Sequence, residues 1–212
     1  FADQAQMDIF EQYFYDLEQR QRGTGNELDY ADIITNIEEK ISIFEIANQG
    51  VSSSSEGDVD ISSSIGNFYR LGSVQVTYYD NGYACEAEPI KLNELNKYKK
   101  SPLAVWTKTR PVYSRHSNSL GESKIKIYPP PQTSVLNSDT VSINYTRRPI
   151  PPNWTYLLGG SKNALYNPSA TDHQDFQLHS SEENNLVVKI LQLAGIAIKD
   201  FQLTGAAAQE EI

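Results

Sequence analysis

The chain has 212 residues, of which 39% are hydrophobic and 21% charged, and its formal net charge is −9 at pH 7. This composition excludes a disordered chain and leaves room for a sizeable core in one large or two small domains. The acidic balance argues against general nucleic-acid affinity, because Lys and Arg supply most of that affinity by neutralising phosphates. No apolar run approaches the length of a membrane span, and Cys85, the single cysteine, excludes an intramolecular disulfide framework.

Two amphipathic helices are expected in an N-terminal helical segment over residues 1–50. Apolar residues recur at three- and four-residue spacings through residues 1–22, and a Gly-Thr-Gly run then ends the helix. A second helix is expected over residues 28–40, while the alternation in residues 41–46 leaves the choice between helix and strand open. The chain opens at Phe1, inside a helical pattern, which leaves a natural start upstream open as well.

Residues 51–67 form a serine-rich segment that we expect to be a mobile polar loop on the surface. The spacing Asp58-x-Asp60-x-Ser62 resembles the start of a calcium-binding loop. An EF-hand loop that began at Asp58 would need glycine at its sixth position and glutamate at its twelfth, where the sequence has Ser63 and Tyr69. We therefore assign no calcium site here.

An antiparallel β domain is expected over residues 68–158. The runs 73–79 and 83–88 flank Asp-Asn-Gly, a turn sequence that favours a β-hairpin. A short helix is expected over residues 91–100. Three further strands follow, at residues 104–113, 124–128 and 140–149, because β-branched or aromatic residues alternate with polar ones and prolines stand at the ends.

A loop over residues 159–179 and a C-terminal helix with its tail over residues 180–212 complete the chain. Ser180 and Glu183 have the spacing of a capping box. The apolar face that follows, from Leu186 to Phe201, is broad enough to predict burial on more than one side. The fold class expected from these elements is α+β, with N- and C-terminal helices in a bundle and the antiparallel β domain between them.

Few residues qualify as chemical sites. Asp172-His173-x-Asp175 could serve as a metal site or an acid–base pair, but a polar, self-solvating loop is the favoured interpretation. Cys85 lies on an alternating strand and is expected to be a small buried residue rather than a nucleophile. His116 and His179 have no ligand spacing around them. We assign no catalytic, cofactor-binding or metal-binding residue, and we expect a protein that is not an enzyme.

Two features instead suit contacts with other molecules. Arg147-Arg148 is the one concentrated positive site, and arginine pairs bidentately with carboxylates, so an acidic partner and an ordinary exposed strand end are both compatible with it. Four aromatic residues could stack on sugars or bases, although core packing or a protein interface is commoner. They are Tyr128, Tyr145, Trp154 and Tyr156.

A set of motifs resembles the head-to-tail adaptor, or tail-tubular, proteins of short-tailed phages, and is most similar to ring proteins of crAss-like gut phages. The motifs cover most of the chain and are specific as a set rather than singly. They are Ala5–Phe14, Glu88 with Leu92 and Leu95, Ser101-Pro102, Arg110-Pro-Val-Tyr113, Ile125–Pro129, Val141–Pro149, Pro152-Asn-Trp154 and Ser180–Gly195.

The resemblance implies a structural virion protein that forms one ring of the connector and extends the portal channel through which the genome passes. Its implied partners are the portal protein, adjacent tail ring proteins and further copies of itself, in a cyclic, dodecameric assembly that forms in the host cytoplasm. DNA would pass through the channel without specific binding, so acidic side chains are expected to face it. A carbohydrate-recognising β module of a phage tail, or another non-enzymatic interaction domain, is the alternative, and a hydrolase is a weaker rival.

The candidate interface residues are Arg147, Arg148, Trp154, Phe201 and Ile212. The tail over residues 204–212 has little apolar area to fix itself, so we expect a neighbouring copy or ring to hold it, with Ile212 as an anchor. Continuation of the helix through its alanines is the alternative.

Overall fold

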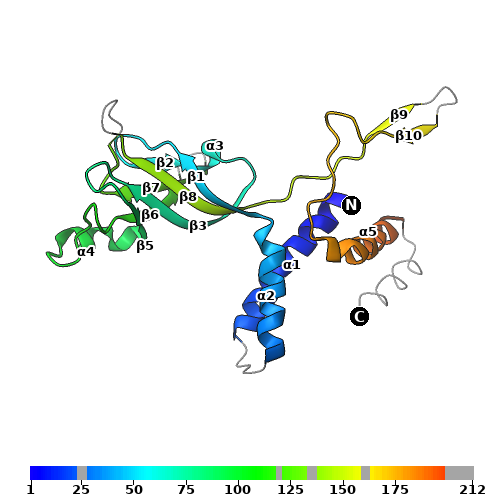
Figure 1. Cartoon of the computed structure of the whole chain (residues 1–212), viewed down its shortest axis with the longest axis horizontal. Coiled ribbons are helices and arrows are strands. Elements are labelled where there is room, and N and C mark those ends of the chain that lie inside the picture. Colours follow the sequence, from blue (N-terminus) through cyan, green and yellow to red (C-terminus); the bar gives the residue numbers. More distant parts are fainter. Residues whose placement is uncertain (23–27, 118–120, 133–137, 159–162, 199–212) are drawn as a thin grey trace. The chain divides into compact units, whose positions relative to one another are not determined.

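The computed structural model describes residues 1–22, 28–117, 121–132, 138–158 and 163–198. The chain divides into two compact units (Figure 1). Unit 1 comprises Phe1–Phe44 and Pro149–Ile212, and unit 2 comprises Glu45–Arg148. The α+β class is confirmed, because N-terminal helices pack with the C-terminal helix and the central sheets are mostly antiparallel.

In its described residues, unit 1 is built on three helices: α1 (Ala2–Arg22), α2 (Leu28–Ser42) and α5 (Glu183–Ile198). Both predicted N-terminal helices are confirmed. The predicted stripe of α1 is its buried face, and Phe10 meets Phe44 edge to face with ring centroids 4.8 Å apart. Burying such a side chain contributes about 1.5–3 kcal/mol, so this face accounts for the packing of α1.

The C-terminal helix buries only part of its broad apolar face within the chain. Leu186 and Gly195 are buried, whereas four large apolar side chains stay exposed. The exposed residues are Val187, Leu191, Ile196 and Ile198. The prediction of burial on more than one side is therefore not met within a single copy.

The predicted capping box at the start of this helix is wrong. A 3₁₀ turn, η2 (Ser180–Glu182), precedes α5, and the His179 Nδ1 accepts a 3.3 Å hydrogen bond from the Ser181 N–H. The tighter turn accompanies the burial of Glu182, whose carboxylate bonds to Lys40 of α2 and to Asn185. Glu183 consequently begins α5 and does not reach back to cap it.

Unit 2 contains two four-stranded sheets that share one core. The first has the order β1-β8-β3-β4 and the second β2-β7-β6-β5, and all pairs are antiparallel except β5 with β6. Buried side chains alternate along the strands, as in Ile125 and Ile127 of β7 and Val74 and Val76 of β3. The strand bounds are Glu45–Val51 (β1), Asp58–Asp60 (β2), Phe68–Thr77 (β3), Ala84–Glu86 (β4), Glu88–Ile90 (β5), Val112–Ser117 (β6), Ser123–Tyr128 (β7) and Thr140–Arg147 (β8).

The predicted hairpin, short helix and two of the three later strands are confirmed. β3 pairs with β4, and the short helix consists of η1 (Leu92–Glu94) and α4 (Leu95–Lys100). The hairpin turn is wider than an Asn-Gly dipeptide turn, because the N–H groups of Asn81 and Gly82 both donate to the carbonyl of Tyr78. Of the turn residues only Gly82 has a positive φ, of 69°.

The predicted strand at residues 104–113 is wrong, because β6 begins only at Val112. Pro111 has no N–H to donate to a ladder, and before it Thr107 and Arg110 exchange backbone hydrogen bonds across a tight turn. Residues 104–110 therefore belong to a connection rather than to the sheet.

The prediction of a polar loop over the serine-rich segment is wrong for its second half. Val59 of β2 and Ile61 of α3 (Ile61–Ser64) are buried in the core, so apolar residues anchor this polar stretch at intervals. Asp60 caps α3 by accepting a 3.2 Å bond from the Ser63 N–H. Of the two aspartates in the calcium-like spacing, Asp60 thus caps α3 and pairs with Lys124 of β7, and Asp58 pairs with Lys126 of β7.

The prediction of an unbroken loop over residues 159–179 is also wrong. β10 (Ala164–Tyr166) pairs antiparallel with β9 (Tyr156–Leu158) in a two-stranded ribbon. This ribbon, drawn in yellow in Figure 1, belongs to unit 1 and not to the sheets of unit 2.

Candidate interaction site

The β9–β10 ribbon exposes apolar side chains on both of its faces. Tyr156 lies opposite Tyr166, and Leu157 lies opposite Leu165. Since successive side chains of a strand point to opposite faces, the tyrosine pair and the leucine pair occupy different faces. All six residues of the two strands β9 and β10 are exposed, and Leu157 and Leu165 each keep 60% of their surface accessible. A soluble ribbon ordinarily keeps at least one polar face, so this one has the character of a contact surface.

Trp154 extends the aromatic face toward the base of the ribbon. Its ring stacks on Tyr156, with centroids 5.6 Å apart, and on Tyr166, with centroids 6.1 Å apart and planes within 10°. The predicted role of Trp154 in a contact surface remains a prediction, but the structure does bring it together with Tyr156 and Tyr166 while leaving all three exposed.

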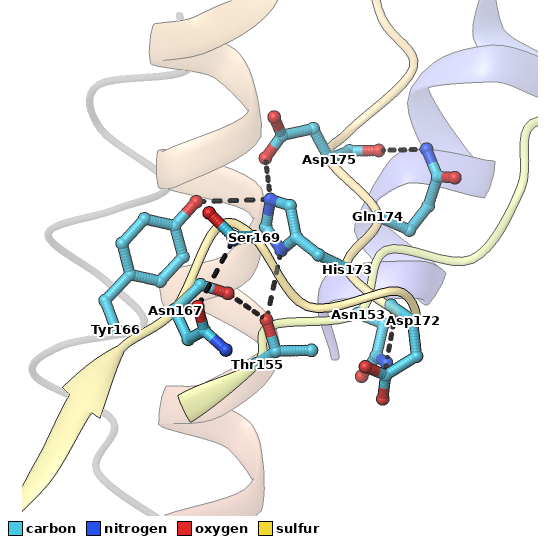
Figure 2. A network of polar contacts seen from close by, with 9 residues as sticks. All are labelled: Asn153, Thr155, Tyr166, Asn167, Ser169, Asp172, His173, Gln174 and Asp175. Carbon is cyan, nitrogen blue, oxygen red and sulfur yellow. Dashed lines mark hydrogen bonds and ion pairs between the residues drawn. The ribbon is translucent and has the colours of Figure 1, made fainter. Parts of the chain in front are cut away.

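Below the strands, His173 is the centre of a polar network (Figure 2). Its Nε2 lies 3.2 Å from the hydroxyl of Tyr166 and 3.3 Å from Oδ1 of Asp175, and its Nδ1 lies 3.5 Å from the hydroxyl of Thr155. Thr155 is buried and donates to the carbonyl of Asn167. This network fixes the orientation of Tyr166 and of both segments that lead into the ribbon.

Asn153 joins the segment that leads into β9 to the segment that follows β10, and we call these two segments the legs of the ribbon. Its backbone exchanges two hydrogen bonds with Gln174, of 2.9 and 3.1 Å. Its side-chain amide donates to the carbonyl of Asp172 at 2.7 Å, as Figure 2 shows. The legs are therefore tied to each other independently of the ribbon's own strand pairing.

Gln6 attaches these legs to α1. Its side-chain N–H donates to the carbonyl of Ile150 at 2.9 Å, and its side-chain oxygen accepts from the N–H of Gln177 at 2.8 Å. The Gln177 side chain in turn accepts from the N–H of Ile150. Gln6 is fully buried, so both of its bonds replace bonds to water that the fold excludes.

A cavity of about 280 Å³ opens between the aromatic face and the start of α1. Trp154, Tyr166 and Phe176 supply its aromatic lining, while Gln174 and Asp175 add an amide and a carboxylate. The remaining lining residues are Ala2, Pro152 and His173. A cavity of this composition suits an apolar or aromatic group that carries one polar edge.

The sequence-predicted residues are only partly brought together. Trp154 lies in unit 1 at the ribbon, whereas Arg147 and Arg148 end unit 2, where the exposed Arg148 lies 5.8 Å from the ring of Tyr69. Phe201, Ile212 and the tail 204–212 lie outside the described residues. Tyr128 and Tyr145 belong to unit 2, where they pack with Trp106 and Phe68 respectively.

The other candidate residues occupy ordinary structural positions. The prediction that Cys85 is buried is confirmed. His116 lies 3.6 Å from Asp58, and His179 caps the 3₁₀ turn η2 that precedes α5. Asp172 and Asp175 take part in the network around His173 and Asn153. Across the described ranges, no group of three or more His, Cys, Asp or Glu residues is placed to hold a metal ion.

Tyr166 and Leu165 are the site residues that sequence reasoning missed. A signal for them was present: from Pro149 to Thr171 only Lys162 is charged, in a chain whose charged fraction is 21%. Such an uncharged, aromatic stretch around Gly159-Gly160 is typical of a hairpin that is covered by a partner.

Comparisons of the chain with protein-family models and with curated proteins find no match in either set. None of the helices that the structure describes combines the length and apolarity required to cross a bilayer.

Proposed function

We propose that this chain is a non-enzymatic structural subunit of a phage virion, which forms one ring of the head-to-tail connector with further copies of itself. The observation that carries this proposal is the β9–β10 ribbon, whose two faces are both apolar and both exposed. The resemblance of the sequence motifs to head-to-tail adaptor proteins supplies the setting. Helices that precede and follow a β domain in the sequence, and that pack with each other, agree with that setting.

The ribbon requires a partner for physical reasons. A two-stranded ribbon of three residues per strand is marginal in water by itself, and its outer edges leave backbone N–H and C=O groups unpaired. Charged side chains usually protect such edges, but β9 and β10 contain none. In a closed ring each copy has a neighbour on either side, so both faces of the ribbon can be covered at once.

The proposed partners beyond further copies are the portal protein and the adjacent tail ring. The exposed face of α5, with Val187, Leu191, Ile196 and Ile198, is a second apolar surface that such a partner could bury. The genome would pass through the ring without specific binding, in keeping with the net charge of −9.

The test compares the wild-type chain with the variant Leu157→Ser/Leu165→Ser, which makes one ribbon face polar. Native mass spectrometry and negative-stain electron microscopy should show a cyclic species for the wild type and smaller species for the variant. The matched control is Tyr79→Ser/Tyr83→Ser, which removes two similarly exposed aromatics from unit 2 and should leave the ring intact.

Labelling of intact particles with an antibody against the chain completes this test, and we expect the label at the portal vertex. A wild-type chain that stays monomeric at every concentration, and that is missing from purified particles, would contradict the proposal.

A carbohydrate-recognising module is the second candidate, and one observation favours it. Exposed aromatic rings beside a carboxylate and an amide, as in the cavity with Trp154, Gln174 and Asp175, are groups that can hold a sugar ring. A glycan array probed with the wild-type chain and with Trp154→Ala tests it. Binding that is lost in the variant would replace the ring proposal with this one.

A further inference from the structure

The net negative charge of the chain is confined to one of its two units. Unit 1 contains 17 Asp and Glu against six Lys and Arg, whereas unit 2 contains ten against 12. The net charges are therefore −11 and +2. Two whole copies repel one another at long range, but unit 2 of one copy and unit 1 of another do not.

Within unit 2, unpaired positive charge gathers in residues 91–110, which we call the basic lobe, so Arg147-Arg148 is not the one concentrated positive site that we expected. This segment holds six of the chain's 18 Lys and Arg but only one acidic residue, Glu94. Lys108 and Arg110 are paired with Asp80 and Glu88. The others are exposed and have no ion pair within the described part of the chain: Lys91, Lys97, Lys99 and Lys100.

The basic lobe also exposes apolar side chains. Leu103 keeps 94% of its surface accessible and Leu92 keeps 57%, and Val105 is exposed as well. A groove of about 530 Å³ is lined by residues of β5 and of the start of the lobe. Ile90 and Tyr113 line it together with Lys91 and Arg115. A surface that combines apolar side chains with free cations suits a protein partner with the opposite charge.

The complementary surface lies on α1 and α2. Residues 1–44 contain ten Asp and Glu against three Lys and Arg. Several of these carboxylates are exposed without an ion pair among the described residues, and Phe1 and Tyr15 are exposed near them in sequence. The exposed carboxylates are those of Asp3, Glu11, Asp32, Glu38 and Glu39.

We propose that the basic lobe of one copy docks on the acidic surface of α1 and α2 in the next copy, head to tail. This inference rests on the proposed function and names the contact that would order the ring. A head-to-tail contact uses two different surfaces of each subunit and closes into a ring when its rotation allows. DNA is the less suitable occupant of the lobe, because a phosphate backbone would leave Leu92, Leu103 and Val105 uncovered.

Charge reversal on each surface tests the contact. Lys97→Glu/Lys100→Glu in the lobe, or Glu38→Lys/Glu39→Lys on α2, should each raise the protein concentration needed for half-assembly at least tenfold in sedimentation velocity runs. The control Arg70→Glu/Ser52→Asp/Ser55→Asp alters net charge as much as the lobe variant does, at exposed positions of unit 2 outside the lobe, and should assemble like the wild type.

Mixing provides the decisive measurement and does not depend on how stable either variant is alone. In an equimolar mixture of the lobe variant and the helix variant, an alternating order places opposite charges at every head-to-tail contact, so the mixture should recover the wild-type assembly. Failure of the mixture to assemble, when circular dichroism shows both variants folded, would overturn the proposal.

Two other outcomes separate this inference from its alternatives. Wild-type rings that persist in the lobe variant would overturn the contact while leaving the ring function in place, whereas a monomeric wild type would contradict the function itself. Fluorescence anisotropy with a labelled DNA duplex tests whether the basic lobe binds DNA instead of a second copy. Loss of duplex binding in the lobe variant, with assembly unchanged, would make the lobe a nucleic-acid surface and refute the docking proposal.

Discussion

Gln6 and Gln177 lie 171 positions apart, yet the side chain of Gln6 accepts a 2.8 Å hydrogen bond from the backbone N–H of Gln177. The same side chain donates to the carbonyl of Ile150, so one amide holds both the segment that leads to the ribbon and the segment that returns from it. The ribbon therefore has a fixed origin on α1. This matters for a contact surface, because a ribbon that swung freely would lose conformational entropy at every contact it formed.

Gln6→Met keeps the length of the side chain and removes both hydrogen bonds. It leaves the Gln177 N–H and the Ile150 carbonyl without this partner in a buried setting, which we expect to lower the free energy of unfolding by about 2–4 kcal/mol. Urea denaturation followed by circular dichroism measures the change. Gln4→Met, at an exposed position of the same helix, should stay within about 0.5 kcal/mol of the wild type.

Lys40→Met should destabilise unit 1 because it leaves the Glu182 carboxylate buried with Asn185 as its remaining side-chain partner. Lys40 is partly exposed, so we expect a loss of about 1–3 kcal/mol rather than the larger cost of a fully buried pair. The double variant Lys40→Met/Glu182→Leu should regain most of the loss, since it leaves no unpaired charge behind. Equal stability of the single and double variants in thermal melts would argue against the ion pair.

The pKa of the Glu182 carboxylate predicts that the helices of unit 1 lose stability at low pH. Burial by itself would raise the pKa of Glu182, but hydrogen bonds from Lys40 and Asn185 outweigh it and lower the pKa below its usual value. Because the pKa of Glu182 is lower in the folded chain than in the unfolded chain, where it is roughly 4.3, the ionised carboxylate stabilises the fold at pH values above the unfolded-state pKa. This contribution disappears as the pH falls through the folded-state pKa.

Unfolding free energies measured from pH 7 to pH 3 should therefore fall below about pH 4.5, and less steeply in Glu182→Gln. Glu183→Gln, at an exposed neighbouring position, should reproduce the wild-type curve.

Gly57 and Gly82 both have positive φ, of 83° and 69°, but only Gly57 is crowded. A Cβ at position 57 would lie 2.5 Å from the carbonyl oxygen of Ile127, whereas nothing lies within 4 Å of one at position 82. Gly82→Ala should cost about 1–2 kcal/mol for the backbone conformation, and Gly57→Ala should cost more, because β7 must also shift. Denaturation of the two variants side by side measures the difference, and similar losses would show that the close approach is relieved easily.

His173→Leu should loosen the ribbon without unfolding the unit that carries it. The variant loses the contacts of His173 with Tyr166, Thr155 and Asp175, each worth about 1 kcal/mol at most in a partly exposed site. We expect amide hydrogen exchange in β9 and β10 to speed up roughly fivefold, with little change in the melting temperature. His116→Leu in unit 2 is the control, and exchange in the ribbon should not respond to it.

The elements with a clear period were predictable from the sequence. The stripe of α1 and the alternation of β7 and β8 each follow from one buried face, and local spacing is enough to reveal such a face. The structure of the serine-rich segment was not predictable in this way, because its buried residues, Val59 and Ile61, are isolated in polar sequence. Only the packing of β2 on β7 makes them core residues, and that pairing spans about 66 positions.

The candidate site was predictable only in part, for a related reason. Trp154 and Tyr156 stand out as aromatics near a proline run, but their stacking partner Tyr166 is brought beside them by the ribbon's register. The role of Gln6 had no local signal at all. A buried glutamine on an amphipathic helix is identified by its distant partners, Ile150 and Gln177, and a sequence pattern shows neither.

Unit 1 is discontinuous, with Phe1–Phe44 and Pro149–Ile212 on either side of unit 2. During synthesis the two N-terminal helices leave the ribosome long before α5. Their apolar face therefore stays uncovered by α5 while more than half of the chain is made. Unit 2 is continuous and can complete its core in the meantime. We expect the nascent chain to bind chaperones through α1 and α2 until Leu186 emerges, and to become resistant to proteases first in the sheets and last at its two ends.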